Sequence, residues 1–351
     1  MIRAMSAGPL LQVDGLTKIF PGVRALDDVS MKVEAGTVHA LMGENGAGKS
    51  TLMRILAGME SADAGTIRFK GGVFAPRHPR EALASGVSMI HQELLPFPEM
   101  TVAENIFMGR EPVRNGLGWV DRDRMVRDAS SLLGRVGASI APSRRMGDLG
   151  VADMQLVEIA KALGHRSELL IMDEPTSALS SRETDALFRL IFELKAAGVA
   201  VIYISHRFEE IFRVADHITV LRDGRVTGCA RADAIDEARL ISMMVGRELR
   251  RADGRRSPMG EPILEVRELG RRGMFEDVSF AVRRGEIVAI AGLMGAGRTE
   301  VLRAIYGLAP ADSGQLLIRG VAARIASPRA ALRLGIAMVS EDRKREGLIG
   351  G

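Results

Sequence analysis

The sequence contains an internal repeat at one constant offset. Glycines at positions 36, 43 and 48 recur at positions 285, 292 and 297, so the members of each pair are 249 residues apart. The same register continues without a gap as far as Met89 and Met338. A repeat of this kind indicates that the chain builds one structural unit twice. Because Gly351 corresponds to Val102 at this offset, we expect one complete domain followed by the front part of a second copy.

The expected domain boundaries follow from this repeat and from composition. We expect a first domain over residues 10–246, a charged linker containing Pro and Gly over residues 247–262, and a truncated second domain over residues 263–351. The chain is 46% hydrophobic and 26% charged, which excludes a disordered protein. The longest apolar runs, near residues 199–204 and 287–294, have the length of strands and are too short to span a membrane.

A phosphate-binding loop lies near the start of the first copy. The segment TVHALM has the composition of a buried parallel strand, and it leads into GENGAGKST and then into the helical pattern LMRILAG. Glycines allow a tight backbone path that points amides at phosphate oxygens, Lys49 reaches the β- and γ-phosphates, and Ser50 can bind magnesium. The fold class that we expect is therefore α/β, of the P-loop NTPase type. The loop residues predicted to hold the nucleotide are Gly43, Glu44, Asn45, Gly46, Ala47, Gly48, Lys49, Ser50 and Thr51.

Two further apolar segments end in polar residues that suit nucleotide hydrolysis. ELLIMDE reads as a strand that ends at Asp173, which can hold magnesium, and Glu174, which can orient or deprotonate the attacking water. VAVIYISHR reads as another buried strand, followed by His206, which can donate a hydrogen bond to a terminal phosphate. We therefore predict Glu174 and His206 as catalytic residues, and Ser50 and Asp173 as magnesium ligands.

These segments resemble the ATP-binding subunits of ABC transporters, whose motifs occur here in the family's order. Phe20 matches the aromatic residue that stacks on adenine in that family. Gln92 matches the glutamine of its Q-loop, and the resemblance implies a catalytic role and a place among the magnesium ligands for this residue. The signature motif, which contacts nucleotide held by the opposite domain, falls on Gly150, Val151, Ala152 and Asp153.

A finer resemblance extends over nearly the whole chain. FPGVRALDDVS, HQELLPFPEMTVAENIFMGRE, VEIAKAL and SEDRKREGL are similar to the duplicated subunits of monosaccharide importers, such as those for ribose, xylose or galactose. This resemblance implies an ABC-type nucleotide-binding domain with a helical subdomain, and ATP and Mg²⁺ as cofactors. The partners that it implies are transmembrane permease subunits and, through the permease, a periplasmic or extracellular sugar-binding protein. It also implies a peripheral location on the cytoplasmic face of the cell membrane.

Two departures from the family pattern affect the expected activity. Gly150 stands where the signature normally carries a serine, so a hydroxyl donor is missing. In the second copy the loop reads GLMGAGRTE, and an arginine, which is bulkier and planar, replaces the lysine. Glu341 occupies the place equivalent to Gln92 and would repel phosphate. We expect a degenerate second site that binds nucleotide poorly or without hydrolysis, formed by Gly292, Gly295, Gly297, Arg298 and Thr299.

Several alternatives remain open at this point. The first domains of two chains could pair as a homodimer, the rest of the second domain could come from elsewhere, or the chain could be a fragment. A non-catalytic or impaired regulatory subunit is the main alternative to a transport ATPase. A soluble ABC protein acting on ribosomes or nucleic acid is a third, but the 48 basic and 44 acidic residues are interspersed and aromatic residues make up only 4%. We therefore expect no nucleic-acid partner.

Overall fold

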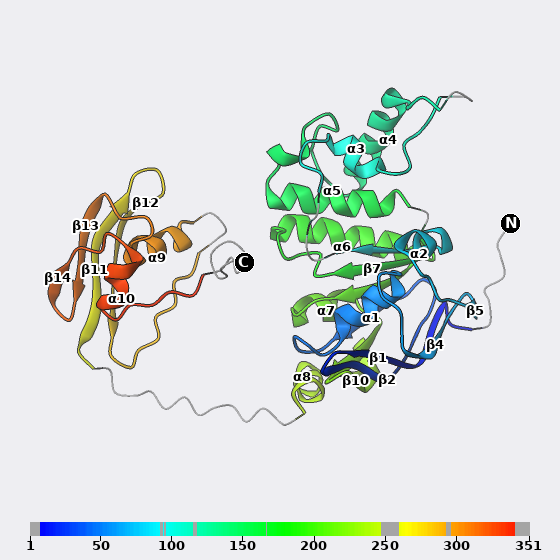
Figure 1. Cartoon of the computed structure of the whole chain (residues 1–351), viewed down its shortest axis with the longest axis horizontal. Coiled ribbons are helices and arrows are strands. Elements are labelled where there is room, and N and C mark those ends of the chain that lie inside the picture. The colour runs from blue at the N-terminus through cyan, green and yellow to red at the C-terminus, as the bar shows by residue number, and fades with distance from the viewer. Residues whose placement is uncertain are drawn as a thin grey trace. The chain divides into compact units, whose positions relative to one another are not determined.

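The computed structural model describes residues 8–91, 94, 96–114, 118–165, 167–246, 260–292 and 296–340. The chain divides into two compact units, residues 1–250 and residues 251–351. Figure 1 shows the elements of each unit along the chain. Within the described ranges, no helix combines the length and the apolar character that a membrane span requires.

A largely parallel sheet forms the centre of the first unit, with the strand order β10-β9-β3-β8-β7-β6. Its strands are β3 (Val38–Met42), β6 (Val87–Ile90), β7 (Leu169–Asp173), β8 (Ala200–Ile204), β9 (His217–Arg222) and β10 (Arg225–Arg231). Every residue of β3, β7 and β8 is buried, as the apolar composition of these segments predicts. Only β10 runs antiparallel to its neighbour, through a two-residue turn in which Asp223 and Gly224 both have positive φ.

A second, antiparallel sheet covers one side of this unit, with the order β2-β1-β4-β5. Its strands are β1 (Leu11–Phe20), β2 (Val23–Val33), β4 (Ala64–Phe69) and β5 (Gly72–Val73). Helix α1 (Lys49–Leu56) lies between the two sheets, and its buried Leu52, Met53 and Leu56 belong to a core cluster that includes residues of both. The phosphate loop thus enters a helix that is fixed on two sides.

Helices cover the other face of the parallel sheet and extend beyond it. Helices α3 (Val102–Phe107), α4 (Arg122–Arg135) and α5 (Val151–Leu163) contact one another and form the expected helical subdomain (Figure 1). The remaining helices are α2 (Pro79–Ser85), α6 (Ser181–Ala196), α7 (Phe208–Val214) and α8 (Glu237–Val245), with short 3₁₀ segments at Met146–Asp148 and Ala232–Ala234. The α/β fold with a helical subdomain that was expected for the first copy is confirmed.

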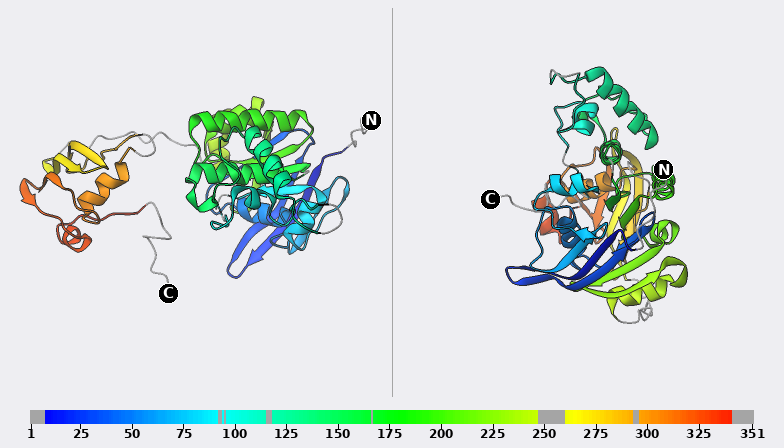
Figure 2. Two further views of the ribbon diagram at one scale, coloured as in Figure 1. Left: turned by 90° about the horizontal axis from the view of Figure 1, so that it is seen from above. Right: turned by 90° about the vertical axis from the view of Figure 1, so that its right-hand side faces the viewer.

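The second unit repeats the antiparallel part of the first. Strands β11 (Pro262–Arg271), β12 (Phe275–Arg283), β13 (Ser313–Ile318) and β14 (Val321–Ala323) pair in the order β12-β11-β13-β14, which corresponds to β2-β1-β4-β5. Helix α9 (Arg298–Tyr306) packs against these strands (Figure 2, left), and α10 (Pro328–Arg333) follows.

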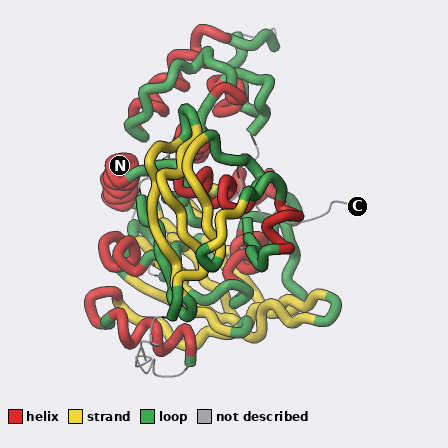
Figure 3. The backbone as a smooth tube through the Cα atoms, turned by 90° about the vertical axis from the view of Figure 1, so that its left-hand side faces the viewer, coloured by secondary structure: helices red, strands yellow, loops and turns green. Residues whose placement is uncertain are grey.

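The parallel part of the sheet is not repeated within the described part of the second unit. Residues 286–292, which correspond to β3, and residues 336–340, which begin at the position of β6, form no strand. Figure 3 colours the chain by secondary structure, with strands in yellow and loops in green. The apolar run near residues 287–294 has the length of a strand but forms none over its described residues.

Candidate functional site

The phosphate loop joins β3 to α1, and its glycines have two different structural roles. Gly43, Gly46 and Gly48 all have positive φ. A Cβ on Gly43 would lie 2.3 Å from the carbonyl oxygen of Leu221, and a Cβ on Gly48 would lie 2.5 Å from that of Ala25. A Cβ on Gly46 would meet nothing within 4 Å. Two of the glycines therefore let neighbouring backbone approach, whereas Gly46 faces open space where a ligand can lie.

Lys49 begins α1 and reaches back across this loop. Its Nζ donates hydrogen bonds to the carbonyl oxygens of Gly43, at 2.7 Å, and Glu44, at 2.9 Å. Burial lowers the pKa of Lys49, while the carboxylates of Asp173 and Glu174 oppose this shift. The ammonium group is thus held at the loop, where the charges of Asp173 and Glu174 at the end of β7 act on it.

A cavity of about 300 Å³ lies where these elements meet. Its lining residues are Phe20, Val23, Ala25, Asn45, Gly46, Gly48, Lys49, Ser50, Thr51, Asp173 and Glu174. The structure thus brings together Phe20 from the end of β1, the phosphate loop, and both carboxylates after β7. Gly43, Glu44 and Ala47 belong to the loop but do not line the cavity. Val23 and Ala25 of β2 were missed from the sequence; their only signal is their position just after the turn that follows Phe20.

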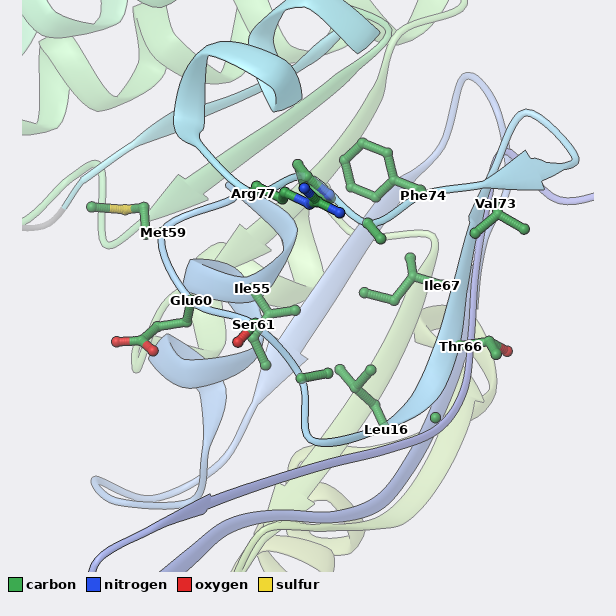
Figure 4. A pocket seen from close by; sticks show the side chains of 14 residues that line it. Leu16, Ile55, Met59, Glu60, Ser61, Thr66, Ile67, Val73, Phe74 and Arg77 are labelled. Atoms are coloured by element: carbon green, nitrogen blue, oxygen red, sulfur yellow. The ribbon is translucent and has the colours of Figure 1, made fainter.

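A larger cleft of about 680 Å³ lies elsewhere in the first unit, between α1, β4 and the segment after β5 (Figure 4). Its walls are mainly apolar, with Leu16, Ile67 and Phe74 among them. An equivalent cleft of about 580 Å³ occurs in the second unit, where Ala326 replaces Arg77. The cleft therefore reflects how this antiparallel sheet packs on its helix in both units, and it contains none of the predicted phosphate-binding residues.

The two carboxylates after β7 lie in different environments. Burial raises the pKa of Asp173, and the charge of Glu174 adds to this effect, while Lys49 opposes it. Glu174 has a positive φ of 48°, and its backbone N–H donates to the carbonyl oxygen of Ile204 at 2.9 Å. Its Oε1 lies 3.2 Å from Nδ1 of the exposed His206. The ends of β7 and β8 therefore place Glu174 and His206 in contact, although 32 residues separate them in the sequence.

Two predicted site residues, Gln92 and Gly295, lie outside the described residues. Strand β6 ends at Ile90 and pairs in parallel with β7, with Ile90 opposite Met172. Strand β6 therefore ends at the edge of the sheet where Asp173 and Glu174 lie.

Comparison with known proteins agrees with this arrangement. The family model described as ABC transporter matches residues 26–177 and 275–348. This chain belongs to the ABC transporter family. An import ATP-binding protein for ribose, galactose or methyl galactoside from Rhizobium etli is 52% identical over 348 residues, which are 98% of this chain and 66% of that protein. Ribose import ATP-binding protein RbsA 1 from Rubrobacter xylanophilus is also 52% identical, over 97% of this chain and 68% of that protein.

Solved structures of ATP-binding cassettes are also similar to this chain. The ADP conformation of an ATP-binding cassette of an ABC transporter superposes with a TM-score of 0.59 at 29% identity, and covers 68% of this chain and 99% of that one. A nucleotide-free cassette gives a TM-score of 0.58 at 30% identity, with 68% and 96% covered. The chain thus holds one whole cassette, and it spans about two thirds of the length of its curated relatives.

The residues predicted to form the signature lie at the start of α5 and not in the cavity. Gly150 precedes the helix as its N-cap and provides no side-chain cap, and Val151, Ala152 and Asp153 form its first turn. Val151 is exposed. A Cβ on Gly150 would meet nothing within 4 Å, so a serine would fit at this position.

The second phosphate loop of the cassette repeat differs from the first at its cationic residue. Gly297, with a φ of 82°, precedes α9, and Arg298 and Thr299 are the first two residues of this helix. A Cβ on Gly292 would lie 3.4 Å from Cδ of Arg298. The arginine stem therefore lies against the start of the loop.

Proposed function

We propose that the first unit binds and hydrolyses MgATP, and that this hydrolysis energises import of a monosaccharide through separate membrane subunits. The observation that carries this proposal is the cavity in which Lys49, Ser50, Asp173 and Glu174 meet, with His206 in contact with Glu174. A bare nucleotide-binding module would need the phosphate loop alone. The paired acidic and imidazole side chains at its edge suit the cleavage of a terminal phosphate.

The phosphate groups would lie over Gly46, where the loop leaves open space, with the N-terminus of α1 directed at them. In this arrangement Lys49 exchanges its hydrogen bonds to two loop carbonyls for charge-assisted hydrogen bonds to phosphate oxygens. Phe20, at the cavity edge, would stack on the adenine. We propose Asn45, Gly48 and Thr51, which also line the cavity, as further nucleotide contacts.

The donor set at the cavity fits a magnesium ion. Mg²⁺ prefers oxygen ligands and combines one or two protein groups with phosphate oxygens and water. The Ser50 hydroxyl and the Asp173 carboxylate are such groups and line the same cavity, and we propose Gln92 as a further ligand. When bound, the ion would neutralise charge on the phosphate oxygens.

Glu174 is the proposed group that orients or deprotonates the attacking water. Its positive φ turns the side chain at the end of β7 towards His206. The imidazole in turn would donate a hydrogen bond to the terminal phosphate while its Nδ1 faces the carboxylate. We propose Gln92 as the third catalytic residue, as the family resemblance implies.

The signature residues 150–153 lie outside the cavity, so a second cassette would have to provide them. We propose that the first units of two chains pair, each offering the amides at the start of α5 to nucleotide on its partner. The second phosphate loop, with Arg298, would remain a degenerate site.

The proposal of sugar import rests on the relatives, which are named for ribose and galactose import. The partners would be permease subunits and, through them, a sugar-binding protein, which would place this chain at the cytoplasmic face of the membrane. A suitable contact surface is the loop before α3, where Phe97 is 49% exposed. The fully buried Asn105 holds the backbone of Phe97 by accepting from its N–H, at 2.9 Å, and donating to its carbonyl, at 3.1 Å.

The decisive test measures phosphate release and ATP binding on the same purified protein. Wild type should release phosphate with Mg²⁺ and ATP, whereas Glu174→Gln should retain ATP binding and lose at least about a hundredfold in turnover, as expected for loss of a general base. Glu168→Gln, just before β7, is the matched control and should behave as wild type. Wild-type ATP binding without turnover would contradict the hydrolysis proposal. Absence of permease subunits from material purified under mild detergent would contradict the transport proposal.

A second candidate, a nucleotide-binding subunit with impaired hydrolysis, is favoured by Gly150. No side chain caps α5, and the hydroxyl expected in the signature is absent. If this glycine limits turnover, Gly150→Ser should raise the ATPase rate several-fold, because the added hydroxyl would stabilise charge on the phosphate of the partner cassette. Gly134→Ser in α4, where a Cβ also meets nothing within 4 Å, is the control. An unchanged rate in Gly150→Ser would remove this explanation.

A further inference from the structure

A buried carboxylate outside the cavity connects the segments that carry Glu174 and His206. Glu210 lies in α7 and is 6% exposed. Its two carboxylate oxygens accept hydrogen bonds from Thr176 Oγ1, at 2.8 and 3.0 Å. Oε2 also accepts from the hydroxyl of Tyr203, at 2.9 Å, and from that of Ser205, at 2.8 Å. Arg207 donates to Oε1 at 3.2 Å.

Burial of the Glu210 carboxylate has a cost in free energy. A buried carboxylate loses its hydration, and only several directed donors offset that loss. Three hydroxyls from two separate places in the sequence, Thr176 after β7 and Tyr203 with Ser205 at the end of β8, supply them here, together with one guanidinium group. Replacing one carboxylate oxygen with an amide nitrogen would leave hydroxyl donors without an acceptor.

The positions of the donors show what the network holds. Thr176 follows Glu174 by two residues, and Ser205 immediately precedes His206. Through these hydrogen bonds, Glu210 therefore links the segment that follows Glu174 to the residue that precedes His206. The short contact between the Glu174 and His206 side chains, 3.2 Å from Nδ1 to Oε1, lies directly beside this link.

We propose that Glu210 is a positioning residue for hydrolysis, which holds Glu174 and His206 at their mutual distance without touching the nucleotide. The proposal rests on the proposed ATPase function of the same site. It also states that Thr176 is the donor through which Glu210 acts on the Glu174 side, and that Ser205 is the donor on the His206 side.

The test compares Glu210→Gln with wild type in ATP binding and in steady-state hydrolysis. No residue of this network lines the cavity, so the Kd for ATP should change less than about twofold. The kcat should fall by about tenfold to a hundredfold, because small displacements of catalytic groups reduce rates to this degree. Glu209→Gln, the exposed neighbour on the same helix, is the control and should leave both quantities unchanged.

A pair of substitutions at Thr176 separates positioning from folding. Thr176→Ser keeps the hydroxyl donor and should retain most of the wild-type kcat, whereas Thr176→Val removes the donor and should lower kcat. The double variant Glu210→Gln with Thr176→Val should lose much less than the product of the two single losses, since both break one connection. Equal losses in the Ser and Val variants, or multiplied losses in the double variant, would overturn the proposal.

A spectroscopic measurement keeps the inference testable if wild type proves inactive. The ¹⁵N resonances of the His206 imidazole report its contact with Glu174, and they should shift in Glu210→Gln and Thr176→Val but not in Glu209→Gln or Thr176→Ser. Wild-type inactivity with these shifts would refute the ATPase function, but it would still support the conclusion that Glu210 holds Glu174 and His206 at their mutual distance. Unshifted His206 resonances, or an active Glu210→Gln variant with wild-type kcat, would refute the positioning role alone.

Discussion

Val38 and Ile287 occupy equivalent places in the two copies of the repeat, yet Val38 is fully buried and Ile287 is 97% exposed. The same contrast separates Ile90, at 2%, from Val339, at 97%. Both segments are apolar in both copies. In the first unit they form β3 and β6 of the parallel sheet, whereas their described counterparts in the second unit form no strand.

The antiparallel parts of the two units do not differ in this way. Strands β1 and β2 of the first unit, and β11 and β12 of the second, are joined by short turns and pair within about twenty residues. Strand β3 instead pairs with β8 and β9, which lie more than 150 residues further along the chain. A parallel strand has no local partner, so its formation depends on contacts with segments that are distant in the sequence.

The largest effect that would sharpen this comparison is a stability difference between matched core substitutions. Ile90→Ala should destabilise the first unit by about 2–5 kcal/mol, because it leaves a cavity beside β7. Val339→Ala, at the equivalent place, should change stability by no more than about 0.5 kcal/mol. Urea unfolding followed by circular dichroism would measure both. A loss of similar size in the two variants would show that residue 339 is packed in solution and would break the comparison.

The sequence predicts much of the first cassette, and the parts that it predicts are local. The phosphate loop and the strand before it depend on neighbouring residues, and the structure contains both of them. The recurrence of the start of the first domain in the second unit was also predicted, because its glycines recur in register.

The sequence does not predict contacts between distant segments. Glu174 and His206 were each predicted, but their direct contact depends on the register of β7 with β8. The network around Glu210 was missed altogether, because a glutamate in a charged helical segment usually lies on the surface. The absence of a strand at residues 286–292 was not predicted either. The apolar composition of this segment is typical of a buried strand, but composition does not show whether other strands pair with it.

The second prediction concerns pH and a residue that only the first copy has. His39 lies in β3, and Val288 stands at the equivalent place. Burial lowers the pKa of His39 from 6.5 to about 4, and the charge of His217 adds to the shift. The unfolded chain thus binds a proton here at a higher pH than the folded chain does. Stability from this residue should be fully present above pH 6.5 and should fall, by up to about 3 kcal/mol, as the pH drops towards 4.

The matched variant for this prediction is His39→Val, which installs the residue of the second copy. It removes the hydrogen bond between Nε2 and Thr219 Oγ1, of 2.7 Å, so stability at neutral pH should also change. The informative quantity is therefore the slope of the unfolding free energy between pH 6.5 and pH 4.5. We expect the slope to be clearly smaller in His39→Val than in wild type. Equal slopes would show that other groups cause the acid sensitivity of the first unit.

The smallest expected effect distinguishes the two phosphate loops by their cationic residues. Lys49→Ala should weaken ATP binding by about tenfold to a hundredfold, because charge-assisted hydrogen bonds to phosphate contribute about 1.5–3 kcal/mol. Arg298→Ala should change the affinity of the chain by less than about twofold. Isothermal titration calorimetry on the whole chain would measure both affinities and the number of nucleotides bound.

Exchange of the two residues would show whether the side chain or its surroundings cause the difference. Lys49→Arg should bind ATP more weakly than wild type, because a bulkier, planar guanidinium group does not replace the compact ammonium group that would contact the phosphate oxygens. Arg298→Lys should gain no second nucleotide, because the strand leading into this loop is absent from the described part of the unit. A second bound ATP in Arg298→Lys would show that the arginine alone inactivates the site, and that the loop of the second unit is already shaped to bind phosphate.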